Sequence, residues 1–150
     1  MGTAAIGNAT EAMVLGAFVE RDFSVSVPFG GGHPYDLVVD LGEPGFLRVQ
    51  CKTAWSVKGC MVFNARSTDH GRGPQPYHGL ADVFGVYFPP RKTVYLVPVN
   101  AIPGSEGRLR LLPTLNNQRK GIRFAAEFEF DRWSDEDLRE LMRDEVLAVA

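Results

Sequence analysis

The sequence predicts an α/β or α+β fold in which one mixed β-sheet is flanked by helices. Helical periodicity lies at both ends of the chain, and short apolar runs typical of strands lie between them. The 150 residues suit a single domain, residues 1–150, whose core is large enough to be stable. We therefore expect the order helix, strands, loop, strands, helix.

The two predicted helices have different signals. The first is expected over residues 9–21, after a cap at Asn8 or Thr10, and its apolar stripe consists of Val14, Leu15, Phe18 and Val19. The second is expected over residues 134–149, where Ser134 and Asp137 form a capping box. Its core-facing side chains are expected to be Leu138, Leu141, Met142 and Val146.

Strands are expected where short runs rich in β-branched and aromatic residues lie between turn signals. These runs are residues 23–27, 35–41, 46–55, 60–63, 82–88, 93–99 and 108–113. Residues 124–130 fit either a strand or a helix. Residues 64–79 lack periodicity and predict a functional or mobile loop, and residues 114–123 form a second stretch that is polar and basic.

Composition gives further expectations. No apolar run approaches the roughly 20 residues that a membrane helix needs. The N-terminal residues lack the basic and apolar regions of a signal peptide, so an intracellular, cytoplasmic protein is expected. Cys51 and Cys60 are not spaced as metal ligands and are expected to be buried thiols.

The charge is unevenly distributed. The net charge is −2, but residues 127–150 hold nine acids and three Arg, which leaves the rest of the chain at +4. A mildly basic body followed by an acidic helix is compatible with a polyanion bound on one face.

One predicted strand has an unusual polar face. Side chains in a strand alternate between faces, so Arg48, Gln50 and Lys52 point one way. A hairpin with the preceding strand brings Asp36 near Gln50 and Lys52, because the turn lies between Asp40 and Phe46. A helix packed over this end would add Glu11. The other interpretation is an exposed polar strand edge, with Glu11 favoured only by the dipole of a first helical turn.

Such a cluster suits phosphodiester hydrolysis. Divalent cations prefer hard oxygen ligands, and Asp36, Glu11, the Gln50 side chain and the Cys51 backbone carbonyl offer them. The metal lowers the pKa of bound water and screens the phosphate. Lys52 is then placed to orient the water or to stabilise charge that develops on the phosphate.

The ordered residues Asp36, Gln50-Cys51-Lys52 and the upstream Glu11 resemble the PD-(D/E)xK nuclease motif, with Gln50 in place of the second acid. That variant, together with residues 77–102 and 109–125, is similar to the group I intron homing endonucleases of this superfamily. The residue before Asp36 is Tyr35 rather than proline. Archaeal-type Holliday junction resolvases share the helical Glu and the Asp…xK core, but resemble the chain less after residue 55.

The resemblance implies a restriction-endonuclease-like core and a Mg²⁺-dependent DNA endonuclease, with Mn²⁺ as a possible substitute, from a prokaryote or a phage. It implies a homodimer or homotetramer, because two active sites cut two strands. Residues 82–88 and the C-terminal helix are candidate interface elements. The substrate is duplex or branched DNA. A junction resolvase and an inactive nuclease fold that only binds DNA remain alternatives.

Basic and amide side chains in these two stretches, residues 64–79 and 114–123, are candidate DNA contacts. Arg66, Arg72, Arg119, Lys120 and Arg123 suit phosphates, and Asn117 and Gln118 suit base edges. Solvated charge and turn capping are the alternatives. We expect Trp55 and Trp133 to be packing residues, and Asp82 to cap a strand or pair with a cation.

Overall fold

The computed structural model describes residues 1–67, 73, 75–114, 116, 118 and 120–149. Its main sheet has five strands in the order β1-β2-β3-β8-β9. The strands are β1 (Ser24–Ser26), β2 (Leu37–Asp40), β3 (Phe46–Thr53), β8 (Val83–Phe88) and β9 (Thr93–Pro98). All neighbours are antiparallel except β3 and β8, which are parallel, so the sheet is mixed as predicted.

Two smaller sheets accompany the main one. A three-stranded sheet has the order β10 (Glu106–Arg110), β5 (Cys60–Asn64) and β4 (Trp55–Val57). A short ribbon pairs β6 (Arg66–Ser67) with β7 (Gln75–Pro76). The expectation of one sheet and of one strand over 46–55 is therefore wrong, since the chain leaves the main sheet at Ala54 and Trp55 pairs with Val62 of β5.

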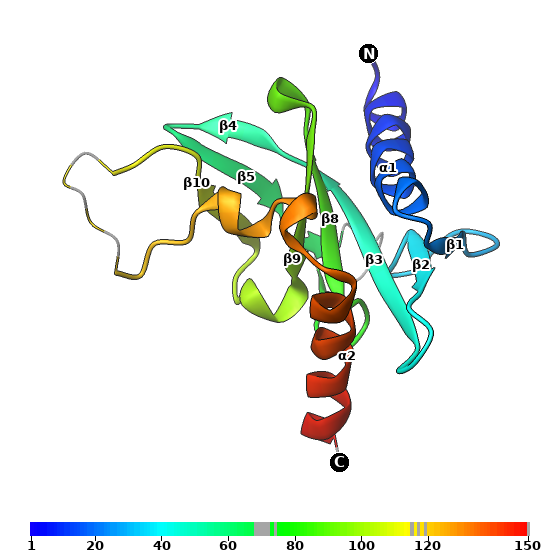
Figure 1. Ribbon diagram of the computed structural model, residues 1–150. Helices are drawn as coiled ribbons and strands as arrows, with labels where there is room; N and C mark the ends of the chain where they lie inside the picture. Colours follow the sequence, from blue (N-terminus) through cyan, green and yellow to red (C-terminus); the bar gives the residue numbers. More distant parts are fainter. Residues whose placement is uncertain (68–72, 74, 115, 117, 119, 150) are drawn as a thin grey trace.

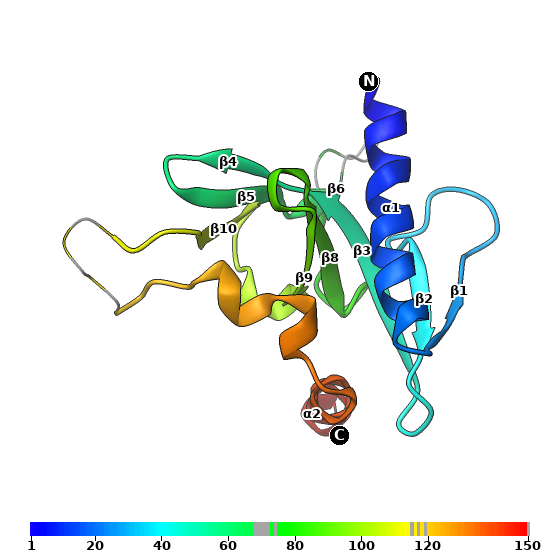
Figure 2. The same cartoon turned by 45° about the horizontal axis from the view of Figure 1, so that its top comes forward.

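Helices and sheets form layers (Figures 1 and 2). Helix α1 (Thr3–Glu20) and helix α2 (Asp135–Val149) pack on one face of the main sheet, where Val14, Phe18 and Leu138 are fully buried. The three-stranded sheet packs on the other face, where the Phe63 and Phe84 ring centroids lie 5.4 Å apart. The main sheet is therefore covered on both sides, which explains the apolar character of its central strands.

Helix α1 differs from the prediction. It begins at Thr3 rather than at residue 9, because the alanine-rich start continues the helix and neither Asn8 nor Thr10 caps it. Thr10 is buried, whereas Val19 is 51% exposed and lies outside the core stripe. The apolar stripe runs through Val14 and Phe18, as predicted.

The C-terminal part largely follows the prediction. Ser134 and Asp137 form the capping box: Asp137 N donates to Ser134 Oγ at 3.0 Å, and Ser134 N donates to Asp137 Oδ2 at 2.9 Å. Leu138, Leu141 and Met142 face the core, and the side chain of Val146 lies outside the described part. Residues 124–130 form 3₁₀ turns, η3 (Ala125–Phe128) and η4 starting at Phe130, instead of a strand or α-helix.

The remaining 3₁₀ turns are η1 (Pro89–Arg91) and η2 (Val99–Ala101). Turn η4, described above, spans Phe130–Arg132. Strand β8 lies between β3 and β9 and is buried, so it is not available as an interface between copies as the sequence suggested. Among the described helices, none is both long and apolar enough to cross a membrane.

Candidate active site

The β2–β3 hairpin places Asp36 at the middle of β3. Leu37 pairs with Val49, and Asp36 N donates to Val49 O at 2.8 Å. Strand β2 begins only at Leu37, so Cys51 of β3 has no backbone partner in β2. The Asp36 side chain takes that role, because Cys51 N donates to Asp36 Oδ2 at 2.8 Å. The predicted hairpin geometry is confirmed, and the carboxylate is oriented by a backbone amide rather than by a flexible side chain.

Oxygen atoms converge beside this carboxylate. In a strand the N–H and C=O of one residue point to the same side, so the Cys51 carbonyl lies on the Asp36 side of β3. Gln50 Nε2 donates to that carbonyl at 3.4 Å. A carboxylate, a backbone carbonyl and a side-chain amide therefore lie around one point at the end of β2.

Lys52 is held on the face of β3 opposite to α1. Its Nζ donates to Arg66 O at 3.2 Å and to Tyr77 Oη at 3.1 Å, and lies 4.8 Å from the Tyr77 ring centroid. These two partners lie at the same end of the β6–β7 ribbon, because Arg66 pairs with Pro76, which precedes Tyr77. Tyr77 is 5% exposed and packs edge-on against Phe84. No periodicity pointed to Tyr77, because it lies within residues 64–79, a segment without a regular pattern.

Glu11 approaches from the helix side. Thr10 Oγ1 and Thr53 Oγ1 are 2.5 Å apart, which fixes α1 over the Val49–Cys51–Thr53 face. Glu11 follows Thr10 and interacts electrostatically with Asp36. Because α1 begins at Thr3, Glu11 lies beyond its first turn, and the dipole explanation for an acid at this position does not apply.

Burial perturbs the titration of the whole cluster. Desolvation raises the pKa of Asp36, while the Cys51 amide and Lys52 act in the opposite direction. The pKa of Glu11 is raised by desolvation and by the negative charge of Asp36. Desolvation lowers the pKa of Lys52 against the raising effect of Asp36, and the pKa of Tyr77 rises to about 12. Two carboxylates that disfavour each other's ionisation would both be stabilised by a bound cation.

The donor set fits a hard divalent cation. Asp36 and Glu11 supply carboxylates, and Gln50 and Cys51 supply neutral oxygens, which is the ligand type that Mg²⁺ prefers. Among the described residues no group of three or more His, Cys, Asp or Glu side chains is placed to bind a metal, so such a site would depend on the neutral oxygens.

Comparison with known proteins agrees with this geometry. A family model described as PD-(D/E)XK endonuclease matches residues 1–131. The chain belongs to the PD-(D/E)XK endonuclease family. A bacterial homing endonuclease, I-Ssp6803I, has the same fold, with a TM-score of 0.69 and 21% identity over 97% of this chain and 98% of that chain. No curated protein matches the sequence.

Arg48 forms an ion pair with Asp82 in this PD-(D/E)XK chain. Its Nη2 lies 2.9 Å from Asp82 Oδ1, and its Nε lies 3.2 Å from Asp82 Oδ2. Asp82 Oδ2 also accepts the Arg48 backbone N–H at 2.7 Å, and the Asp82 side chain is fully buried. The expectation that Asp82 pairs with a cation is confirmed, and the ion pair joins β3 to the start of β8.

The predicted DNA contacts of this endonuclease-family chain differ in their surroundings. Arg66 lies at the base of the ribbon, and its Nε is buried without a hydrogen-bond partner among the described residues. Gln118, Lys120 and Arg123 are exposed. Arg72, Asn117 and Arg119 lie outside the described residues. Trp55 is 47% exposed, so the expectation that it is a packing residue is wrong.

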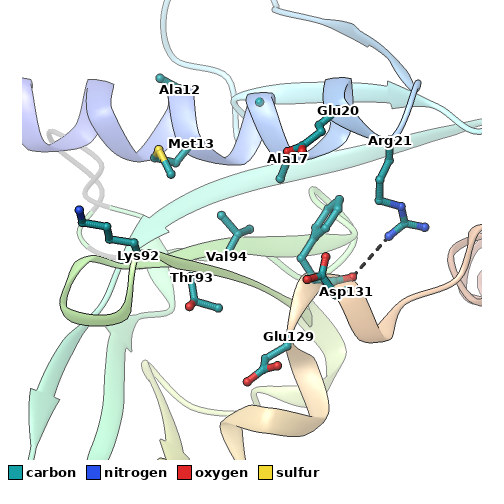
Figure 3. Close-up of a pocket in the computed structure, with 12 residues that line it drawn as sticks. Ala12, Met13, Ala17, Glu20, Arg21, Lys92, Thr93, Val94, Glu129 and Asp131 are labelled. Atoms are coloured by element: carbon teal, nitrogen blue, oxygen red, sulfur yellow. Dashed lines mark hydrogen bonds between the residues drawn. The ribbon is translucent and has the colours of Figure 1, made fainter.

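A groove of about 700 Å³ lies elsewhere on this PD-(D/E)XK fold, between α1, the start of β9 and the 3₁₀ turns (Figure 3). Its charged lining is mixed, with three acids, Glu20, Glu129 and Asp131, and two basic residues, Arg21 and Lys92. Asp36, Gln50 and Lys52 do not line it.

Proposed function

We propose that the chain is a Mg²⁺-dependent DNA endonuclease that hydrolyses phosphodiester bonds in duplex DNA, in the manner of homing and restriction enzymes. The observation that carries the proposal is the Asp36 carboxylate, oriented by the Cys51 amide at 2.8 Å and lying beside Lys52 in a chain of the PD-(D/E)XK endonuclease family. Residues 1–150 are inferred to act as one domain, in the cytoplasm of a prokaryotic or phage-infected cell.

Asp36, Glu11, the Gln50 amide oxygen and the Cys51 carbonyl would hold the cation. When bound, Mg²⁺ lowers the pKa of an attacking water molecule and screens the phosphate. The Cys51 amide donates to Asp36 Oδ2 and so orients the carboxylate that would bind the cation. Gln50 Nε2 contacts the Cys51 carbonyl at 3.4 Å, so the Gln50 amide group already lies beside the proposed ligands.

Lys52 would act on the phosphate. The Tyr77 hydroxyl and the Arg66 carbonyl hold its ammonium group near Asp36 without neutralising its charge. Preorganised charge of this kind stabilises the developing negative charge of a transition state more than the ground state. Burial lowers the pKa of Lys52, but the neighbouring Asp36 favours its protonated form.

DNA binding would involve Arg66 close to Lys52 and the exposed Gln118, Lys120 and Arg123 further along. Arg72, Asn117 and Arg119 stay in the proposal on sequence grounds. We infer that a homodimer or homotetramer pairs two Asp36–Lys52 clusters, one for each strand of the duplex. Helix α2 remains a candidate interface element.

Purified protein, with and without Mg²⁺ or Mn²⁺, is to be incubated with a linear duplex library and a four-way junction. The Lys52→Ala variant is the control. We expect cleavage of particular duplexes that depends on the metal and is lost in the variant. Symmetric junction cuts would replace the proposal by a junction resolvase.

A second measurement separates metal binding from cutting. Mg²⁺ should raise the melting temperature of the wild type and not that of Asp36→Asn, because binding to the folded state stabilises it. DNA binding without any metal-dependent cleavage, and without this shift, would show an inactive binding module.

A further inference from the structure

We propose that the outer face of the three-stranded sheet is a second DNA-contact surface, which lies against a groove of the duplex outside the Asp36–Lys52 cluster. The inference rests on the proposed function, since it takes duplex DNA as the substrate. The surface, here termed the arm face, consists of Trp55 on β4, Lys58 in the β4–β5 turn, and Arg108 and Arg110 on β10.

Strand register places these side chains together. Val62 of β5 pairs with Trp55 on one side and with Arg108 on the other, so the three share one face. Cys60 pairs with Val57 and with Arg110 on the same face. The alternate residues Met61, Phe63 and Leu109 point the other way, into the core.

The arm face is covered by its own long side chains. Val62 is fully buried and belongs to neither core cluster, although it lies on the outer face. Its cross-strand neighbours Trp55 and Arg108 are both 47% exposed, Arg108 by its side chain. An exposed indole and a guanidinium on the two sides of Val62 offer one face both an apolar contact and a phosphate or base-edge contact.

Charge complementarity identifies the occupant as a polyanion. Residues 54–67 and 104–124 contain seven Lys or Arg and a single acid, Glu106, which leaves nine Lys or Arg and 17 acids for the rest of the chain. Glu106 pairs with Arg108 at 3.3 Å, but both side chains are 47% exposed. Arg110 donates to the carbonyls of Leu112 and Pro113 at 3.0 Å, and these contacts leave its charge in place.

The arm face lies close enough to Lys52 to contact the duplex that is bound there. Strand β3 leads from Lys52 directly into β4, and three residues of extended chain span at most about 10 Å. The β4–β5 hairpin extends from the main sheet on the side away from α1 in both views (Figures 1 and 2). A duplex held at Lys52 would therefore run along the arm, and a strand ribbon fits a major groove of about 12 Å.

The first test measures the salt dependence of DNA binding by the full chain, without divalent metal, by anisotropy of a labelled duplex. The double variant Lys58→Asn/Arg108→Gln removes two positive charges, together with the exposed ion pair between Arg108 and Glu106. Lys58 has φ 47°, a left-handed conformation that Asn tolerates. Glutamine in place of Arg108 keeps an aliphatic stem opposite Val62, the residue with which Arg108 pairs. Arg132→Gln is the matched control, because Arg132 is exposed on η4 near α2.

We expect the slope of log K against log salt to fall by about 2 in the double variant, since each phosphate contact contributes about 0.9. Arg132→Gln should keep the wild-type slope. If the wild type binds and cuts DNA but the double variant keeps the wild-type slope, the proposal that the arm face contacts DNA is refuted and the proposed function stands. A wild type that neither binds nor cuts would refute the proposed function as well.

The second test places Trp55 itself. Trp133→Phe leaves Trp55 as the single tryptophan of the two in the chain. This change costs no hydrogen bond among the described residues, because Trp133 Nε1 is buried without a partner there. Saturating duplex should quench the Trp55 emission and shield it from iodide. Unchanged emission and iodide access at saturation would exclude Trp55 from the interface.

Discussion

Helix α1 can lie directly on the main sheet because residue 85 has no side chain. A Cβ built on Gly85 would lie 2.6 Å from Val14 Cγ1, 3.0 Å from Val49 Cγ1 and 3.3 Å from Val14 Cγ2. Carbon atoms in favourable contact are about 3.5–4.0 Å apart. Gly85→Ala therefore requires helix and strand to separate by roughly 1 Å. Gly85 pairs with Cys51, so this displacement occurs beside the proposed metal site.

The magnitude follows from two opposing effects. Overpacking of a tight core costs about 1–3 kcal/mol, and the better strand propensity of alanine returns about 0.5–1 kcal/mol. We expect a net loss of about 1–2 kcal/mol and a melting temperature lower by about 2–8 °C. Cleavage should also fall, because α1 carries Glu11 and is displaced from Asp36.

Thermal and urea unfolding of five proteins, which are the wild type, Gly85→Ala, Val14→Ala, the double variant of these two and Gly104→Ala, test this reasoning. Gly104→Ala is the control, since its Cβ would meet nothing within 4 Å. Val14→Ala combined with Gly85→Ala should recover stability relative to the sum of the single changes, with a coupling of about 1 kcal/mol or more. A Gly85→Ala protein as stable as wild type, or a double variant without recovery, would refute the close packing inferred here.

Three further predictions concern the buried charges. Asp36→Asn should abolish cleavage and should be at least as stable as wild type at neutral pH. Burial raises the pKa of Asp36 above 3.8, so ionisation of Asp36 destabilises the wild-type fold progressively as the pH rises through 3.8 towards the pKa of the folded state. Melting curves of both proteins across pH will show whether this difference is present. Lys52→Ala should slow cleavage by about 10²–10³-fold and should retain metal-free DNA binding. Tyr77→Phe removes one acceptor from Lys52 and should slow cleavage by about 10-fold. Single-turnover kinetics distinguish the two effects, and a Tyr77→Phe enzyme as fast as wild type would argue against a positioning role for Tyr77. Asp82→Ala should cost about 2–3 kcal/mol in urea unfolding, because it leaves the half-buried Arg48 without its carboxylate, and Arg48→Met/Asp82→Ala should recover part of that loss.

Much of the candidate site was predictable from local sequence. Alternation along β3 placed Gln50 and Lys52 on one face, and the short turn before Phe46 fixed the register that brings Asp36 to Cys51. These are short-range consequences of strand geometry, so sequence patterns express them well. The capping box of Ser134 and Asp137 is predictable for the same reason.

Other features had no local signal. Tyr77 meets Lys52 across 25 residues, and Thr10 meets Thr53 across 43 residues. The division of residues 46–55 between two sheets depends on the pairing of Trp55 with Val62, and that pairing also exposes the indole. Each depends on which segments pack together, and composition or periodicity within one segment does not report it.

The sequence by itself therefore determined the order of elements, the mixed sheet and the Asp36–Gln50–Lys52 set, because strand alternation and turn length act over a few residues. Only the tertiary structure decided that Glu11 approaches from the helix face, that Lys52 is held by both strands at the base of the β6–β7 ribbon, and that a basic sheet extends beside the site. Those arrangements arise from long-range packing, in which burial of apolar surface selects among many pairings that the local sequence leaves open.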